Sequence, residues 1–342
     1  MSNVSPSPEA ERKNRGLVGA AIMPKSVAII RANGLIESGA LGKEEEVRLS
    51  RVCALNGGNL PLFAGAVSSD GRLAAVSARG MVRIVSLDDC STVADTHLID
   101  SRVGSITFSP DSRSLLLGAF DGKVYRWRFS ELVGFHSGAS LLFERYVGHG
   151  GVVSSVAFHP AGRVFFSTDW AGSLRAWLRY DEDDYRGRWD VATASDRFYT
   201  EVSVSASAAR LSEAIESMVV SGDGEFLLTA TREGTAQLWS VRGFRMIGQT
   251  AAHQGQIRSI VLDQSGRTAV TCGRDGFVRR WRIAPASWDE KKREFVEEGE
   301  WYQPEARLVR FAPDGAVMVL SDERVSRIVA KIEPPSATRR PQ

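Results

Sequence analysis

The chain has 342 residues, of which 43% are hydrophobic and 25% are charged, and its formal net charge is +2 at pH 7. This composition is ordinary for a soluble globular protein, and the charge is too small to indicate general affinity for nucleic acids or membrane surfaces. The apolar runs have strand length, far below the roughly 20 residues that a transmembrane helix needs, so we expect no membrane span.

Both ends of the chain are rich in proline, serine or charged residues. We expect mobile tails over residues 1–16 and 334–342, and the first tail lacks the apolar stretch of a signal peptide. The three cysteines, Cys53, Cys90 and Cys272, form neither a CxxC pair nor an even disulfide set. They favour a reducing compartment, and we therefore predict a cytoplasmic protein.

Residues 17–333 lie between these tails and are predicted to form a single domain. Residues 17–49 contain strand-sized apolar segments around the turn "RANG". One turn then recurs six times, and each copy has an apolar segment before it, such as "VGSITF", and another after it, such as "LLLGAF". Short strands separated by Gly/Asp turns at this spacing indicate an all-β array with almost no helix. The residues that align in the six turns are Gly71, Ser112, Gly162, Gly224, Gly266 and Gly315.

A third strand-like segment follows in each unit, and in four units it ends in tryptophan. These four tryptophans are Trp127, Trp177, Trp239 and Trp281. A unit of three or four short strands cannot bury both faces of its sheet alone. Stacking such units around an axis buries those faces and leaves only short edges exposed.

Over roughly residues 57–333 the chain resembles the WD-repeat β-propeller family. Gly148-His149 and Ala252-His253 stand where that family has its Gly-His pair, and the same interval separates each histidine from the tryptophan of its unit. The aspartate that follows tryptophan in the family is missing from all four units. The resemblance implies an all-β propeller, and we predict seven blades: six clear ones and a degenerate one in residues 17–49. Six blades is the alternative.

Few residues follow the sixth repeat, so we expect the last blade to take its outer strand from the N-terminal segment and close the ring. By contrast, the interval between the third and fourth repeats is too long for one blade and indicates an insertion around residues 181–210. Residues 187–194, "GRWDVATA", are a candidate outer strand, and residues 208–217, "AARLSEAIES", a candidate short helix. Insertions of this kind often carry function, and a tolerated surface loop is the alternative.

The resemblance also implies a structural network in each blade that joins a histidine, a hydroxyl residue of the second strand, a turn aspartate and the tryptophan. The fifth repeat matches all four positions with His253, Thr271, Asp275 and Trp281. These groups look like catalytic machinery but are expected to stabilise the blade. In the third repeat Ala171 replaces the turn acid, so we expect His149 to lack its partner there.

Local signs of catalysis are missing. None of the five histidines lies in an HExxH motif or at metal-ligand spacing, and no GxSxG motif is present. The acidic run at residues 181–184 lacks EF-hand spacing and fits a solvated loop. We therefore predict a protein that is not an enzyme and has no cofactor and no metal site.

In the family, the residue before the turn acid points to a face that commonly binds partners. The residues at that position are Phe120, Trp170, Arg232 and Arg274. Aromatic and arginine side chains are enriched at interface hot spots, so we predict a non-catalytic protein-interaction scaffold or complex subunit. Local packing of these side chains is the alternative reading. Two other functions stay open: a ligand-binding, metal-binding or enzymatic propeller that uses its central channel, and a ribonucleoprotein component, which the low net charge disfavours.

Overall fold

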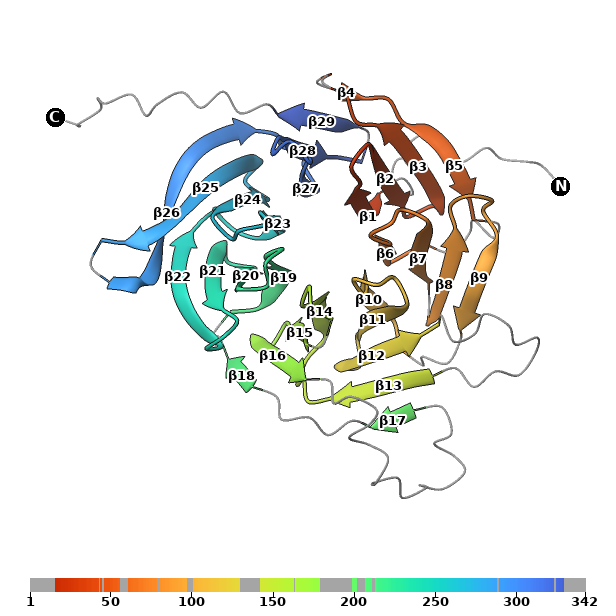
Figure 1. Ribbon diagram of the computed structural model, residues 1–342, viewed down its shortest axis with the longest axis horizontal. Helices are drawn as coiled ribbons and strands as arrows, with labels where there is room; N and C mark the ends of the chain where they lie inside the picture. Colours follow the sequence, from red (N-terminus) through yellow and green to blue (C-terminus); the bar gives the residue numbers. More distant parts are fainter. Residues whose placement is uncertain are drawn as a thin grey trace.

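Seven β-sheets stand around a central axis in the computed structural model (Figure 1). The structure describes residues 16–42, 44, 46–55, 61–78, 80–96, 101–129, 142–162, 164–178, 199–201, 207–210, 213–287, 289–322 and 324–328. Every regular element in that part of the chain is a strand, and none of it forms a helix that could cross a bilayer. The prediction of a seven-bladed β-propeller is therefore confirmed, and the six-bladed alternative is wrong.

We number the blades in chain order. Blade 1 contains β1 (Leu17–Ile22), β2 (Ser26–Arg31), β3 (Leu35–Ala40) and β5 (Ser50–Ala54). Blade 2 contains β6 (Ala64–Val67), β7 (Leu73–Ala78), β8 (Met81–Ser86) and β9 (Thr92–Thr96). Blade 3 contains β10 (Val103–Phe108), β11 (Ser114–Ala119), β12 (Lys123–Arg128), β13 (Leu142–Val147) and β17 (Tyr199–Glu201).

Blade 4 contains β14 (Val153–Phe158), β15 (Val164–Asp169), β16 (Ser173–Leu178) and β18 (Ser207–Arg210). Blade 5 contains β19 (Ile215–Val220), β20 (Phe226–Thr231), β21 (Thr235–Ser240) and β22 (Arg245–Ala251). Blade 6 contains β23 (Ile257–Leu262), β24 (Thr268–Gly273), β25 (Phe277–Ala286) and β26 (Asp289–Tyr302). Blade 7 contains β27 (Leu308–Phe311), β28 (Val317–Leu320), β29 (Val325–Ile328) and β4 (Glu46–Val47).

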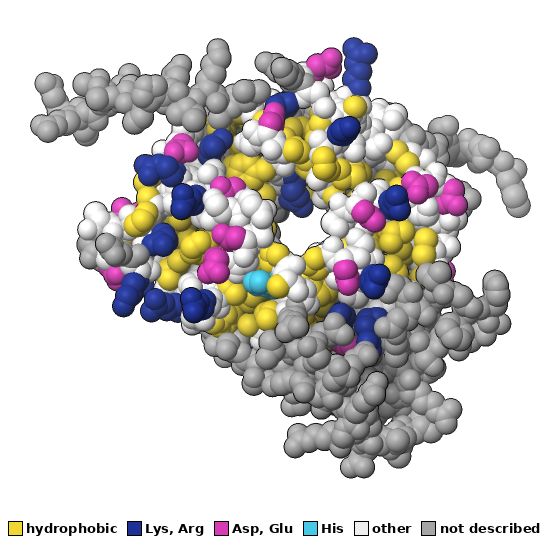
Figure 2. Space-filling view, in the orientation of Figure 1, with side chains coloured by type: hydrophobic (Ala, Val, Ile, Leu, Met, Phe, Trp, Pro, Cys, Tyr) yellow, Lys and Arg dark blue, Asp and Glu magenta, His cyan; other side chains and the backbone are white. Residues whose placement is uncertain are grey.

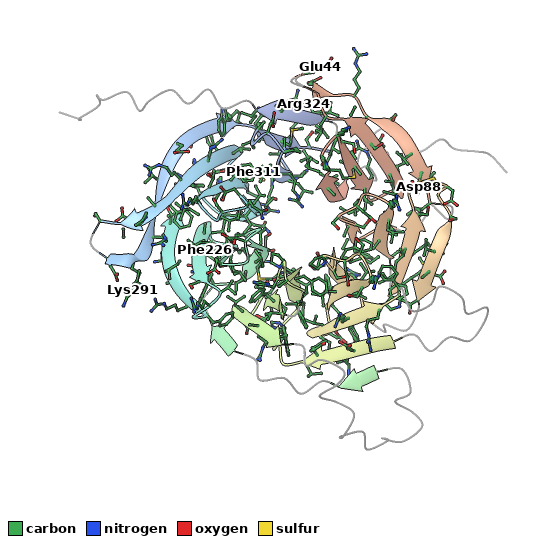
Figure 3. All side chains as sticks on the ribbon, in the orientation of Figure 1. Glu44, Asp88, Phe226, Lys291, Phe311 and Arg324 are labelled. Carbon is green, nitrogen blue, oxygen red and sulfur yellow. A yellow bond between two sulfur atoms is a disulfide. The ribbon has the colours of Figure 1, made fainter. Side chains whose placement is uncertain are left out.

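The core lies between the blades rather than at the centre of the ring. One apolar cluster fills each interface between neighbouring blades; for example, Val82 and Ile84 of blade 2 pack with Leu115 and Trp127 of blade 3. Second strands such as β11 are buried along their whole length, because a blade lies on each side of them. Figure 3 shows side chains filling these interfaces, and Figure 2 shows that the centre of the disc stays open.

The ring closes where the two ends of the domain meet. Strand β4, from the N-terminal part of the chain, pairs with β29 as the outer strand of blade 7. Nearby, the Leu17 N–H donates to the Asp322 carboxylate over 3.0 Å. The predicted closure by the N-terminal segment is thus confirmed.

The predicted insertion is organised differently from expectation. The outer strand of blade 4 is β18, not residues 187–194, which lie outside the described residues. The predicted helix at 208–217 is wrong, because residues 208–210 belong to β18 and residues 215–217 belong to β19. Helix-favouring Ala and Glu are overridden there by pairing with strands of blades 4 and 5. Strand β17 adds to the edge of blade 3 in parallel with β13.

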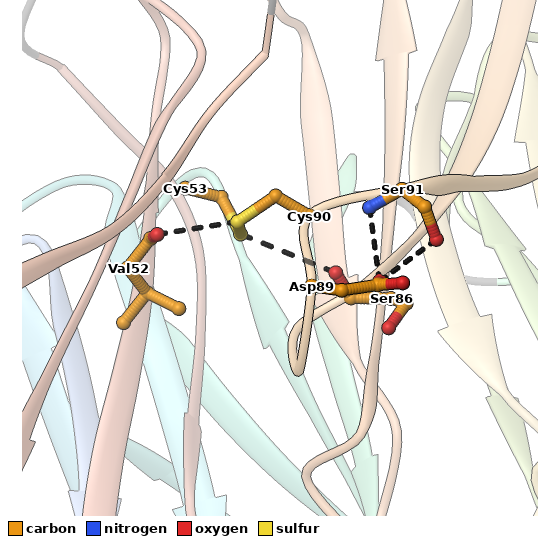
Figure 4. Close-up of a disulfide and its surroundings, with 6 residues drawn as sticks. All are labelled: Val52, Cys53, Ser86, Asp89, Cys90 and Ser91. Carbon is orange, nitrogen blue, oxygen red and sulfur yellow. Dashed lines mark hydrogen bonds between the residues drawn. A yellow bond between two sulfur atoms is a disulfide. The ribbon is translucent and has the colours of Figure 1, made fainter.

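A disulfide joins blades 1 and 2 (Figure 4). Cys53 of β5 is bonded to Cys90 in the turn between β8 and β9, 37 residues later in the chain. Our expectation that the cysteines form no disulfide was wrong, because side chains far apart in sequence meet where the outer edges of two blades pack together. The cysteine pattern therefore no longer favours a reducing compartment. Cys272 is a free, buried thiol, and burial raises its pKa to about 12.

Candidate functional site

The four residues predicted to bind a partner occupy the same place in four successive blades. The turns between second and third strands lie on the same side of the disc as the connections between blades, because the strands of a blade alternate in direction. We call this side the upper face. The N–H of Phe120 donates to the Arg102 carbonyl over 2.9 Å, and the N–H of Trp170 donates to the Val152 carbonyl over 3.1 Å. Arg232 and Arg274 make the equivalent bonds in blades 5 and 6.

Aromatic rings and guanidinium groups alternate across the upper face. The Arg102 guanidinium carbon lies 4.3 Å from the ring centroid of Phe63 and 5.3 Å from that of Phe120. The Phe120 ring meets the Trp170 ring edge-on, with 5.8 Å between centroids. The Arg232 guanidinium carbon lies 5.3 Å from the Trp170 ring centroid. These five side chains, Phe63, Arg102, Phe120, Trp170 and Arg232, form what we call the upper-face row.

The row is open to solvent although its members contact one another. Phe120 is 38% exposed and Trp170 is 40% exposed. The Arg232 side chain is 52% exposed and also pairs with Glu216 over 2.6 Å. The contacts of Arg102 and Arg232 with the rings have the geometry of cation–π pairs. Such pairs order long side chains before a partner binds.

The structure brings together three of the four predicted residues and adds two others. Arg274 is exposed on blade 6, but within the described residues no ring contact joins it to the row. Phe63 and Arg102 were missed because they lie in connections between blades, where no repeat motif marks them. The signal that could have found them is their position, since each immediately precedes the first strand of its blade.

The network predicted in blade 6 has its four members within hydrogen-bond distance of one another. His253 Nδ1 lies 2.9 Å from Asp275, His253 Nε2 lies 2.7 Å from the Thr271 hydroxyl, and Trp281 Nε1 lies 3.0 Å from that hydroxyl. The indole N–H can only donate, so the hydroxyl accepts it and offers its own proton to Nε2. Nδ1 then donates to the carboxylate.

Electrostatics keep this histidine neutral and the carboxylate charged. Burial lowers the pKa of His253 despite the nearby Asp275. Burial alone would raise the pKa of Asp275, but hydrogen bonds from Arg279, His253 and the Phe277 N–H outweigh it and lower that pKa to about 2. A neutral imidazole held on both nitrogens inside a blade fits a structural role.

His149 in blade 4 also has a complete network, so the expectation that it lacks a partner was wrong. Its Nδ1 lies 2.9 Å from Asp169 and its Nε2 bonds the Ser167 hydroxyl, which accepts the Trp177 N–H over 2.7 Å. Asp169 is the last residue of β15, two positions before Ala171. The carboxylate therefore comes from the strand rather than from the turn.

Blade 6 shows why a blade has an acid for its histidine either at the end of the second strand or in the following turn, but not at both positions. The residue equivalent to Asp169 there is Gly273, and a Cβ at that position would lie 2.4 Å from His253 Nδ1 and 2.7 Å from the Asp275 carboxylate. A side chain at the strand position would displace the turn acid from the histidine. The acid is the strand residue Asp169 in blade 4 and the turn residue Asp275 in blade 6.

A cavity of about 640 Å³ lies among the first strands of blades 2 to 7. Its polar lining consists mainly of hydroxyl side chains, including Ser105, Ser155, Ser217 and Ser259, together with Arg258 and Arg310. Within the described residues, no three histidine, cysteine or acidic side chains lie close enough together to hold a metal ion.

Three segments of the chain, residues 89–128, 141–177 and 245–282, match a family model described as "WD domain, G-beta repeat". A "WD repeat-containing protein 91 homolog" from Dictyostelium discoideum is 24% identical over 219 residues, which cover 64% of this chain and 26% of that protein. "Transducin beta-like protein 3" from Bos taurus is 25% identical over 194 residues, covering 53% of this chain and 21% of that protein.

A shorter match joins the chain to a "p21-activated protein kinase-interacting protein 1-like" from Danio rerio, 27% identical over 89 residues that cover 26% of this chain and 22% of that protein. The chain spans about a quarter of the length of the curated relatives it matches. The matched repeats, the seven blades and the two histidine networks lead to one conclusion. The chain is a seven-bladed β-propeller that carries WD repeats and is similar to WD-repeat proteins.

Proposed function

We propose that this propeller is a non-catalytic protein-interaction scaffold, alone or as a subunit of a larger assembly, and that a partner protein binds the upper-face row. The observation that carries this proposal is the unbroken contact of Phe63, Arg102, Phe120, Trp170 and Arg232 across four neighbouring blades. A single exposed aromatic on a protein surface needs no explanation, but a connected row of exposed rings and guanidinium groups supports an interaction site here.

The chemistry of the row suits a protein partner. Tryptophan and arginine dominate interface hot spots, because they bury large areas and make directional bonds at a small entropic cost. The rings and guanidinium groups already hold one another, so binding would order few additional side chains. One relative is named as a protein that interacts with a kinase, which supports protein binding by propellers of this type.

A site-specific photo-crosslinker tests this proposal. The crosslinker replaces Trp170 in one variant and Val93 in a control, whose side chain is 45% exposed on the outer strand β9. In extracts of the native cell we expect the Trp170 variant to capture a discrete partner protein that the Val93 variant does not. Equal capture by both variants would refute the assignment of the upper face, and so would the absence of capture by a further variant that carries the crosslinker at the exposed Arg274 and keeps Trp170.

A further inference from the structure

Blades 4 and 6 carry an arginine at the same position of the third strand, two residues before the tryptophan. In blade 6 this arginine is Arg279, and its guanidinium has three acidic partners, of which Asp275 and Glu300 are the closest and Glu297 lies at 3.9 Å. Nη1 lies 2.9 Å from the turn residue Asp275, and Nη2 lies 2.6 Å from Glu300 on the neighbouring strand β26. Blade 6 therefore shows that an arginine at this position of the third strand binds carboxylates.

In blade 4 the equivalent arginine, Arg175, lacks the two closest of these partners. The turn acid is replaced by Ala171, and the residue paired with Arg175 across the strands is Ala208, where Arg279 faces Glu300. Within the described part of the chain Arg175 forms no ion pair, and its Nε is buried without a hydrogen-bond partner. A guanidinium in a partly buried place without a counter-charge is costly for the free protein.

A backbone N–H near Arg175 also lacks the acceptor that its equivalent has in blade 6. In blade 6 the Asp275 carboxylate also accepts the backbone N–H of Gln254 over 3.2 Å. The equivalent residue in blade 4 is Gly150, and its N–H makes no hydrogen bond within the described residues. Asp169 takes over only part of the task of Asp275, since it binds His149 and the Ser173 N–H over 2.7 Å.

The place left by the missing acid is accessible from the upper face. Gly150 is exposed, and a Cβ built there would meet nothing within 4 Å. The Arg175 guanidinium lies directly beneath the same loop, because a Cβ on Gly148 would be 3.0 Å from its Nη1. Trp170, the most exposed ring of the upper-face row, immediately precedes Ala171.

We propose that blade 4 binds a carboxylate of an acidic partner segment where the Asp275 carboxylate of blade 6 meets Arg279 and the Gln254 N–H, the side that Asp169 leaves free in blade 4. The carboxylate accepts from Arg175 and from the Gly150 N–H, while an apolar side chain next to it packs on Trp170. Arginine suits this role because its planar fork matches a carboxylate. The inference rests on the proposed function, since it names the chemistry of the segment that the upper face binds.

The test uses a randomised peptide library displayed on phage and selected against the full chain. Selected peptides are synthesised with their acidic residue intact or changed to the amide. Three variants are compared with the wild type: Arg175→Gln, Trp170→Ala and Ala171→Asp. The last variant restores the turn acid of blade 6 and so supplies Arg175 with a carboxylate from its own blade.

We expect every high-affinity peptide to contain an aspartate or glutamate, and the change to the amide to weaken binding by about tenfold or more. Arg175→Gln and Ala171→Asp should weaken it by a similar factor, and Ala171→Asp should do so without lowering the melting temperature. Ala171→Asp keeps the test informative if Arg175→Gln fails to fold.

Peptides that need Trp170 but bind Ala171→Asp and the amide as tightly as the acid would overturn this inference and leave the proposed function standing. Peptides whose binding ignores Trp170, or a library that yields no binder, would contradict both.

Discussion

At the residue scale, the position of one carboxylate distinguishes two otherwise similar blades. Asp169 and Asp275 perform the same task for His149 and His253 from backbone positions two residues apart. Ser167 and Thr271, which are equivalent, complete the same bonds to tryptophan. The chemistry of the buried network is thus retained while the surface above it changes.

We expect Asp169→Ala to lower the free energy of unfolding by about 1–3 kcal/mol, because it leaves a buried histidine nitrogen without an acceptor. Asp275→Ala should have a comparable effect on blade 6. Asp88→Ala is the matched control, since Asp88 is exposed in the turn after β8 (Figure 3). Urea unfolding measures all three variants, and an Asp169 variant as stable as the control would contradict the network.

Both network histidines should make the fold sensitive to mild acid. Burial lowers the pKa of His149 and of His253 below 6.5, so the unfolded chain binds more protons than the native one once the pH falls below 6.5. Stability should therefore fall between pH 7 and pH 5. The pKa values of Asp169 and Asp275 are lowered from 3.8, so their contribution is lost only at more acidic pH.

The measurement is urea unfolding at several pH values. Replacing both histidines by glutamine should lower stability at pH 7 but flatten its dependence on pH between 7 and 5. A slope equal to that of the wild type would show that other groups carry the acid sensitivity.

The sequence predicted the position of Trp170 but not its surroundings. The repeat places residues 120, 170 and 232 at equivalent points of the backbone, and this could be deduced from the turns alone. The repeat pattern could not show that a strand aspartate replaces the missing turn acid. It gives the sequence position where an acid is expected, but it does not show which other side chains can reach the histidine. Contacts such as that of Arg102 with Phe63 depend on how neighbouring blades pack.

At the element scale, inner strands were predicted better than outer ones. The second strands are buried between blades and carry continuous apolar runs, so their pattern is strong in the sequence. Outer strands such as β18 lie at the sheet edge with weak patterning, and their partners are fixed only by the assembled blade. The same packing of outer edges brings Cys53 to Cys90.

The disulfide between β5 and the turn after β8 should be measurable by counting thiols. In denaturant without reductant we expect one reactive thiol per chain, that of Cys272, because Cys53 and Cys90 are bonded. Replacing Cys53 and Cys90 by serine should lower the free energy of unfolding by about 2–4 kcal/mol. Three reactive thiols in the denatured, unreduced protein would contradict the bond.

At the scale of the whole molecule, the ring depends on a short seam between its first and last blades. Only Glu46 and Val47 form the strand that completes blade 7. Val47 packs on the cluster that includes Val27 of blade 1 and Met318 of blade 7. Opening this seam would expose the apolar faces of both blades.

We therefore expect Val47→Asp to lower the free energy of unfolding by about 1–3 kcal/mol, because it places a carboxylate against an apolar cluster. Val93→Asp, on the exposed edge of blade 2, is the control and should change stability little. Thermal unfolding followed by circular dichroism compares the two, and equal melting temperatures would argue against the seam.

The central claim is that a partner protein binds the upper-face row. Its most direct test is the affinity of Trp170→Ala for the partner captured by crosslinking, measured by calorimetry beside Val93→Ala. We predict that Trp170→Ala binds about tenfold or more weakly, as expected for a hot-spot residue, and keeps the wild-type melting temperature. Wild-type affinity of Trp170→Ala for that partner would contradict the claim.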